Sequence, residues 1–342
     1  MRKFLSVAAA AMMVCTFTSC DDEETTLTLP TNYSFDNVDY SGQTARINLL
    51  STLESTIKSA NDGVTKVTKD ELVAIYENTN NLFDTDKNIS GKTAEPFKSE
   101  AYDIFEKVEL YSGSSDNIID GRLFDNDGHE MAQMTAKGLM GALLYYQATS
   151  VYLGEEKMNV DNEEVTEGKG TTMQHHWDEA FGYFGAPASG YPETDEALWY
   201  WAKYAEEMSP AFDVRATIYD AFIEGRTAIG NKDYKARDAA IETIKTNWEK
   251  LVAACAVHYI NNVIADIDAN DTGSLYHHWS EGQAFAKGLL YNLDKKITTE
   301  KFNQVISLFG EKPDDAEVPN LQQANLILKD VYGFTDAEIL NL

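Results

Sequence analysis

One stripe of apolar side chains constrains the fold of this chain more than any other feature. It runs through residues 235–268 at steps of three and four, and comprises Ile241, Ile244, Trp248, Leu251, Cys255, Tyr259, Val263 and Ile267. Side chains at these steps share one face of an α-helix, so the spacing predicts a helix of about seven turns with one buried face. Such a helix buries enough apolar surface to organise a bundle.

Helical periodicity recurs along the chain, and we find neither the alternating pattern of strands nor a convincing hairpin signal. The stretch 129–153 is apolar on most sides from Gly138 onward, which predicts a central buried helix. Further helices are expected at 97–111, 194–207, 211–230, 299–309 and 320–332.

Capping boxes mark two of the expected helix starts. Thr68 and Thr335 are each followed three residues later by Glu, the spacing with which side chains satisfy free N–H groups at a helix start. Residues 155–170 are acidic and are expected to form the main irregular connection. The expected fold is all-α, with two packed helical-bundle lobes at 43–165 and 166–342.

The first 19 residues predict a lipoprotein signal peptide. Arg2 and Lys3 precede an apolar stretch, 4–14, that is too short to span a bilayer. Phe17-Thr18-Ser19-Cys20 resembles a lipobox, in which Cys20 becomes the acylated first residue. We therefore expect a protein anchored in the outer membrane through Cys20; the alternative is an ordinary secretory signal with an incidental cysteine.

A polar tether is expected at residues 20–42, and it opens with Asp21-Asp22-Glu23-Glu24. An acidic run directly after the lipidated cysteine resembles the export signal of surface lipoproteins in some Gram-negative bacteria. A solvated tether is the simpler explanation, so a surface-exposed and a periplasm-facing position both stay open.

The charge of the chain excludes one class of partner. Lys and Arg number 28 and Asp and Glu number 56, which gives a formal net charge of −28. Nucleic-acid binding needs clustered cations that neutralise phosphates, so we expect no nucleic-acid partner. After loss of the signal peptide and lipidation of Cys20, Cys255 is the one remaining thiol; its apolar setting predicts an inert buried side chain.

Two near-copies of one motif hold four of the six histidines. The copies read His175-His176-Trp177-Asp178-Glu179 and His277-His278-Trp279-Ser280-Glu281. Residues three apart share a helix face, which pairs His176 with Glu179 and His278 with Glu281. His175 and His277 lie four residues before the same glutamates and are the alternates.

Two interpretations of these motifs stay open. In the first, His176, Glu179, His278 and Glu281 converge on a metal ion such as iron or zinc, as paired Glu and His do in helical-bundle metal sites. In the second, the motifs are structural, and each histidine donates to a carboxylate or a backbone carbonyl. A site for some other ligand is a third alternative.

Enzyme signatures are missing from the sequence. It has no His-Glu-x-x-His motif, no Gly-x-Ser-x-Gly motif and no phosphate-binding glycine loop. We therefore expect no catalytic residues, and a peptidase is the least favoured interpretation.

Two acidic stretches are candidates for calcium sites. The first stretch matches the ligand spacing of an EF-hand loop at Asp84, Asp86, Asn88, Ser90 and Glu95. It departs from that loop at Ile89, where the turn needs glycine. The second stretch comprises Asp125, Asp127 and Glu130. We expect solvated turns or helix caps at both, with calcium as the alternative.

Several blocks resemble a family of bacterial lipoproteins catalogued as a domain of unknown function. These blocks are Tyr40-Ser41-Gly42-Gln43-Thr44 with Arg46, Lys137-Gly138-Leu139-Met140-Gly141-Ala142, both His-His-Trp motifs with the residues that follow them, and Ala221-Phe222 with Gly225-Arg226. More distantly, the chain looks like the imelysin group, helical proteins with two bundle-like halves and a Gly-x-His-x-x-Glu motif. His176 to Glu179 and His278 to Glu281 match that motif, although Gln174 and Tyr276 stand where it has glycine.

The imelysin resemblance implies a role in bacterial iron uptake. It suggests an outer-membrane lipoprotein that binds a metal or a metal complex in iron acquisition and works with a partner from an uptake system. The alternative is a non-catalytic surface binding or accessory lipoprotein in which both motifs are structural.

Overall fold

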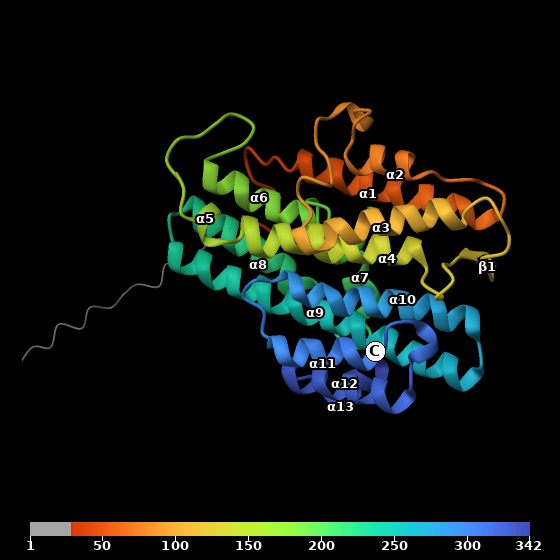
Figure 1. The fold of residues 1–342 in the computed structure, drawn as a ribbon. Coiled ribbons are helices and arrows are strands. Elements are labelled where there is room, and N and C mark those ends of the chain that lie inside the picture. Colours follow the sequence, from red (N-terminus) through yellow and green to blue (C-terminus); the bar gives the residue numbers. More distant parts are fainter. Residues whose placement is uncertain (1–28) are drawn as a thin grey trace, which may run out of the picture.

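The computed structural model describes residues 29–342, and this part of the chain is built mainly from α-helices (Figure 1). The expected all-α fold is confirmed. The signal peptide, Cys20 and the acidic run lie outside the described residues. None of the helices from residue 29 onward combines the length and the apolar character needed to cross a membrane.

The first layer of helices comes mostly from the N-terminal half of the chain. Its elements are α1 (Ser41–Ser59), α2 (Lys69–Tyr76), α3 (Glu95–Tyr111), α4 (Met131–Leu139), the π-helical segments η3 (Met140–Tyr145) and η4 (Gln147–Tyr152), and α6 (Thr172–Phe184). Short turns join them: η1 (Ala60–Asp62), η2 (Leu82–Asp84) and α5 (Glu155–Met158).

The second layer is organised by α9 (Tyr234–Ala269), which packs against α8 (Arg215–Gly230) and α10 (Thr272–Gly288). The layer is completed by α7 (Tyr200–Met208), η5 (Leu289–Tyr291), α11 (Thr299–Phe309), η6 (Pro313–Asp315), α12 (Val318–Tyr332) and α13 (Asp336–Asn341). Figure 1 shows α9 to α13 on one side of the molecule and α1 to α4 on the other.

The two layers share one continuous hydrophobic core, which draws on residues from Tyr33 to Leu342. Their backbones approach closely where η3 packs against α10, because a Cβ on Gly141 would lie only 2.9 Å from the Cα of Gly288. The expected lobe boundary at residue 165 does not separate these layers, since α6 lies beyond it yet packs on α1 and η4.

A small antiparallel hairpin interrupts the helices, which corrects the expectation of no strands. It pairs β1 (Ile118–Ile119) with β2 (Arg122–Leu123). The turn residues Asp120 and Gly121 have φ of 48° and 71°. Asp-Gly is a common turn for such hairpins, so the signal was present in the sequence, and two short strands leave the fold class unchanged.

The described part of the expected tether packs against the body of the protein. The ring of Tyr33 stacks on Phe181 with centroids 3.8 Å apart, and its hydroxyl donates a 2.6 Å hydrogen bond to Asp178. The Tyr33 N–H donates to the carbonyl of Ala188 at 2.9 Å. Residues 29–40 therefore form a docked segment that leads into α1.

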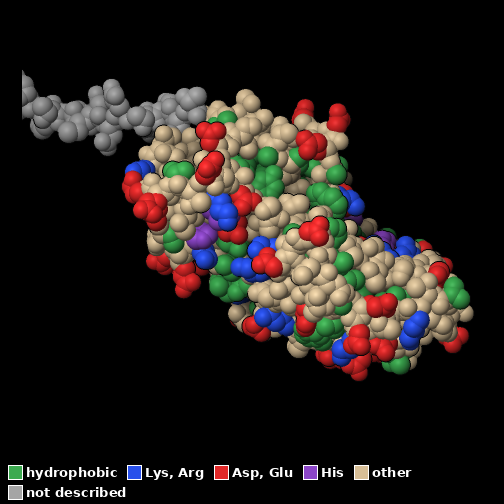
Figure 2. Space-filling view, turned by 90° about the horizontal axis from the view of Figure 1, so that it is seen from above, with side chains coloured by type: hydrophobic (Ala, Val, Ile, Leu, Met, Phe, Trp, Pro, Cys, Tyr) green, Lys and Arg blue, Asp and Glu red, His purple; other side chains and the backbone are tan. Residues whose placement is uncertain are grey.

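The outer surface agrees with the acidic composition. Figure 2 shows Asp and Glu side chains spread over the face seen from above, with Lys and Arg interspersed among them.

Candidate functional site

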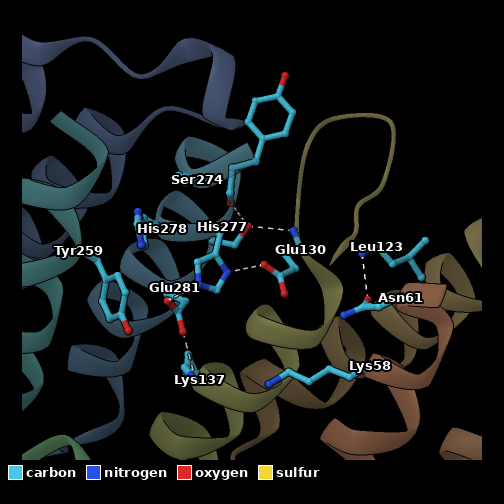
Figure 3. Close-up of polar contacts among 12 residues, drawn as sticks. Lys58, Asn61, Leu123, Glu130, Lys137, Tyr259, Ser274, His277, His278 and Glu281 are labelled. Atoms are coloured by element: carbon cyan, nitrogen blue, oxygen red, sulfur yellow. Dashed lines mark hydrogen bonds and ion pairs between the residues drawn. The ribbon is translucent and has the colours of Figure 1, made fainter. Parts of the chain in front are cut away.

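The second His-His-Trp motif, on α10, lies beside two buried carboxylates. His277 Nδ1 is 2.5 Å from Glu130 Oε2, and His277 Nε2 is 3.3 Å from Glu281 Oε2. Figure 3 shows the imidazole between the two glutamates, which come from the residue before α4 and from α10 itself. Glu130 is 2% exposed and Glu281 is 3% exposed, so one ring contacts two desolvated acids.

A buried lysine extends this cluster toward α1. Lys137 Nζ is 3.3 Å from Glu281 Oε1. Burial lowers the pKa of Lys137, but the carboxylates of Glu281 and Glu54 raise it by more, so the net shift is upward and the ammonium form persists. Glu54 in turn pairs with Lys58 at 2.5 Å. We call Glu130, His277, Glu281 and Lys137 the buried charge cluster.

The neighbouring His278 points to a different partner. Its Nδ1 is 2.6 Å from Asp266 Oδ2 on α9, and its ring lies 6.0 Å from that of Tyr259. The expected pairing of His278 with Glu281 is therefore replaced by the alternate pairing of His277 with Glu281. A helix allows both spacings, and the position of Asp266 decides between them.

The first motif, on α6, shows the same preference for the alternate histidine. His175 Nε2 is 3.9 Å from Glu179 Oε2, and Glu179 Oε1 accepts a 3.0 Å hydrogen bond from Gln43. His176 Nδ1 donates to the carbonyl of Lys157 at 3.0 Å. Burial lowers the pKa of His176, which keeps its ring neutral near pH 7.

The residue between Trp177 and Glu179 forms a buried ion pair. Asp178 is fully buried and accepts hydrogen bonds from Arg226 Nε at 2.9 Å and from Tyr33. Burial raises the pKa of Asp178 to about 6 despite the opposing charge of Arg226. Ser280 replaces this acid in the second motif, and its Oγ accepts a hydrogen bond from the Glu130 N–H.

Both tryptophans occupy equivalent structural positions. Trp177 Nε1 donates to the carbonyl of Phe222 and Trp279 Nε1 donates to the carbonyl of Phe309, each at 2.9 Å. Both rings are fully buried. Each indole thus ties its own helix to another element, α8 in one case and α11 in the other.

The two motifs have separate surroundings. In the described part of the chain, no hydrogen bond or ion pair joins His176 or Glu179 to His278 or Glu281. The partners of the first motif come from α1, α8 and the residues after η4, and those of the second come from α4, α9 and α11. The four residues expected to share a metal ion are not brought together.

Among residues 29–342, one group has His, Asp or Glu ligand atoms close enough for a metal ion. It consists of Asp125, Asp127 and His129, whose ligand atoms lie within 4.8 Å of one another. Asp125 Oδ2 already contacts His129 Nδ1 at 2.9 Å and Lys107 Nζ at 2.7 Å. Burial raises the pKa of Asp125, and His129 and Lys107 lower it by more, so it stays ionised. Both acids belong to an acidic stretch visible in the sequence, whereas His129 carried no signal there; Glu130 belongs to the buried charge cluster.

The EF-hand-like stretch does not gather its acids. Asp86 pairs with Lys87 at 2.8 Å and Glu95 pairs with Lys98 at 2.5 Å. Ile89, where the calcium loop needs glycine, is fully buried in the core. These residues act as turn and surface groups in the structure.

Cys255 is also no reactive group. It is a free, fully buried thiol on α9, and burial raises its pKa well above the ordinary value. A protonated, inaccessible thiol is a poor nucleophile.

The fold and its paired motifs define a class of all-α chains with two packed helical layers. Comparison with protein families identifies the family within that class: the sequence profile described as Domain of unknown function (DUF4856) matches residues 106–308, and the chain belongs to this family. No curated protein and no solved structure matches the chain. The distant likeness to imelysins stays a prediction.

Proposed function

We propose that this protein is a non-catalytic binding or accessory lipoprotein of the outer membrane, in which both His-His-Trp motifs are structural. One observation carries the structural role: each Trp indole donates to a carbonyl of another element, and three of the four motif histidines lie within 3.0 Å of a carboxylate or a carbonyl of this chain. The lipobox at Cys20 and the acidic run after it support the membrane location.

The test compares stability with ligand response. Trp177→Phe and Trp279→Phe keep an aromatic ring but remove the indole donor, which leaves a buried carbonyl without its partner. We expect each variant to lose about 1–3 kcal/mol of unfolding free energy by chemical denaturation. His176→Ala and His278→Ala should also lower stability while leaving the metal content of the purified protein unchanged. A loss of bound metal with unchanged stability would reject the structural role.

A second candidate function is binding of a metal ion or metal complex in iron acquisition, together with a partner from an uptake system. The grouping of Asp125, Asp127 and His129 favours it, because carboxylate and imidazole are ligands of iron and zinc. The bond from Lys107 to Asp125 opposes it, since a metal ion would compete with that ammonium for the same oxygen.

Metal analysis of the purified chain separates the possible sites. Loss of iron or zinc in Asp127→Ala and His129→Ala would place the metal beside α4. Loss in His176→Ala and His278→Ala would instead favour the four residues expected from the sequence. Absence of bound metal, with no melting shift on adding iron or zinc, would reject this candidate.

A further inference from the structure

A cavity of about 440 Å³ lies on the second layer, away from both His-His-Trp motifs. One wall is the N-terminal half of α9, and the opposite wall is the connection from η5 to α11; Tyr332 at the end of α12 completes the lining. Three lysines, Lys245, Lys250 and Lys296, face this space together with three acids. The volume suits a small organic molecule.

A buried acid fixes the shape of the cavity. Glu249 is 3% exposed. It accepts hydrogen bonds from the backbone N–H of Lys296 at 2.8 Å, from Asn292 Nδ2 at 3.0 Å and from the Tyr332 hydroxyl at 2.7 Å. The connection from η5 to α11 and the end of α12 thus both bind this carboxylate of α9. Because both of its oxygens already have donors, Glu249 holds the walls in place and has little capacity left for a ligand.

The other charged side chains that line the cavity differ in whether they have an ion-pair or hydrogen-bond partner. Lys245 pairs with Asp294 at 2.8 Å, and Glu242 on the rim accepts a hydrogen bond from Thr246. Lys250 Nζ instead lies 4.6 Å and 4.8 Å from the ring centroids of Phe212 and Phe334. Within residues 29–342, neither Lys250 nor Lys296 has a carboxylate at ion-pair distance. This leaves two ammonium groups available in a chain whose acids outnumber its bases two to one.

We propose that this cavity binds a small organic anion, with its carboxylate or phosphate group between Lys250 and Lys296 and its body against Tyr332. Two ammonium groups without a carboxylate at ion-pair distance can donate charge-assisted hydrogen bonds to oxyanions. The fixed walls reduce the cost of ordering the site on binding. The proposal goes beyond the accessory role, since it assigns a ligand class to a cavity that neither motif touches.

Calorimetric titration of the full chain with citrate and with inorganic phosphate tests the proposal, and glucose serves as the neutral control. We expect saturable binding of at least one anion, weakened about tenfold or more in Lys250→Gln and in Lys296→Gln. Lys69→Gln, at the start of α2, removes the same charge far from the cavity and should change the affinity less than about twofold. Circular dichroism checks that every variant is folded.

Three results would overturn the proposal. These are no heat of binding with either anion, equal binding of glucose, and equal weakening by Lys69→Gln. Citrate binding without phosphate binding supports a carboxylate ligand, and the reverse supports a phosphorylated one. Because none of these variants touches Cys20 or the motifs, a negative result leaves the proposed accessory role standing.

Discussion

Gly225 on α8 has no room for a side chain. A Cβ at this position would lie 2.0 Å from Cζ2 of the buried Trp177 ring, a clash that only a shift of the indole or of the backbone can relieve. A Cβ on Gly230, at the end of the same helix, would have no other atom within 4 Å. The two glycines therefore lie on the same helix but differ in the space available for a side chain.

We predict that Gly225→Ala lowers the unfolding free energy by about 1–3 kcal/mol, because the indole or the backbone of α8 must shift. Gly230→Ala should be neutral or stabilising by up to about 1 kcal/mol, since alanine restricts the unfolded chain. Urea denaturation of both variants measures the difference. Equal effects would contradict the close contact of α8 with Trp177.

Asp178 gives the protein a specific pH dependence. Its folded pKa of about 6 lies above the ordinary value of 3.8, so between pH 4 and 6 the folded protein keeps a proton that the unfolded chain has released. Stability contributed by this group therefore falls as pH rises through that window. We predict that the stability of the wild type relative to Asp178→Asn falls by roughly 2 kcal/mol from pH 4 to pH 6.

Denaturation curves at pH 4, 5, 6 and 7 measure this difference. Asp116→Asn is the control, because Asp116 is exposed. A stability difference between the wild type and Asp178→Asn that stays constant over the window would contradict the raised pKa.

At the scale of residues, the sequence identified the paired motifs but not their partners. Repetition of His-His-Trp was visible, and so was the ambiguity between the two histidines of each copy. The contact of His277 with Glu130 spans 147 positions, and no local pattern encodes it. Lys137 was part of a recognised block, yet its burial beside Glu281 depends on how α4 packs against α10.

At the scale of elements, local patterns located most helices. The helix expected at 235–268 is α9, Tyr234–Ala269, and the one expected at 299–309 is α11. Both expected capping boxes, at Thr68 and Thr335, are confirmed. The buried helix expected at 129–153 starts as α4 and continues as the π-helical segments η3 and η4. A π-helical turn holds one more residue than an α-helical turn. Such turns come from tertiary packing and leave no periodic signal in the sequence.

The composition of the docked segment 29–40 did not indicate its structural role. Its polar residues suggested a tether, whereas one aromatic ring, Tyr33, attaches it to α6. We predict that Tyr33→Phe keeps the stacking on Phe181 but loses about 1–2 kcal/mol of stability, because Asp178 loses a donor. Tyr33→Ala should also release the segment, seen as faster amide hydrogen exchange in residues 31–40.

The control for both Tyr33 variants is Tyr111→Phe. The Tyr111 hydroxyl makes no hydrogen bond within residues 29–342, so its removal should change neither stability nor exchange. Unchanged exchange in Tyr33→Ala would show that other contacts hold the segment.

At the scale of the whole molecule, the proposed anchor makes a simple prediction. Cys20→Ser removes the lipidated sulfur, so the protein should move from the membrane fraction to the soluble fraction. An acyl chain contributes about 0.8 kcal/mol per buried CH₂, which makes partial retention unexpected once the lipid is absent. Fractionation followed by immunoblotting is the measurement; full retention of Cys20→Ser in the membrane would contradict lipid anchoring at this residue.

The docking of Tyr33 also limits how far a lipid-anchored form could rise above the bilayer. Nine peptide steps separate Cys20 from residue 29, and a chain of that length reaches about 30 Å at most. A tether that stayed free up to residue 42 would more than double this maximum reach. The helical body of a lipid-anchored form would therefore stand close to the lipid headgroups.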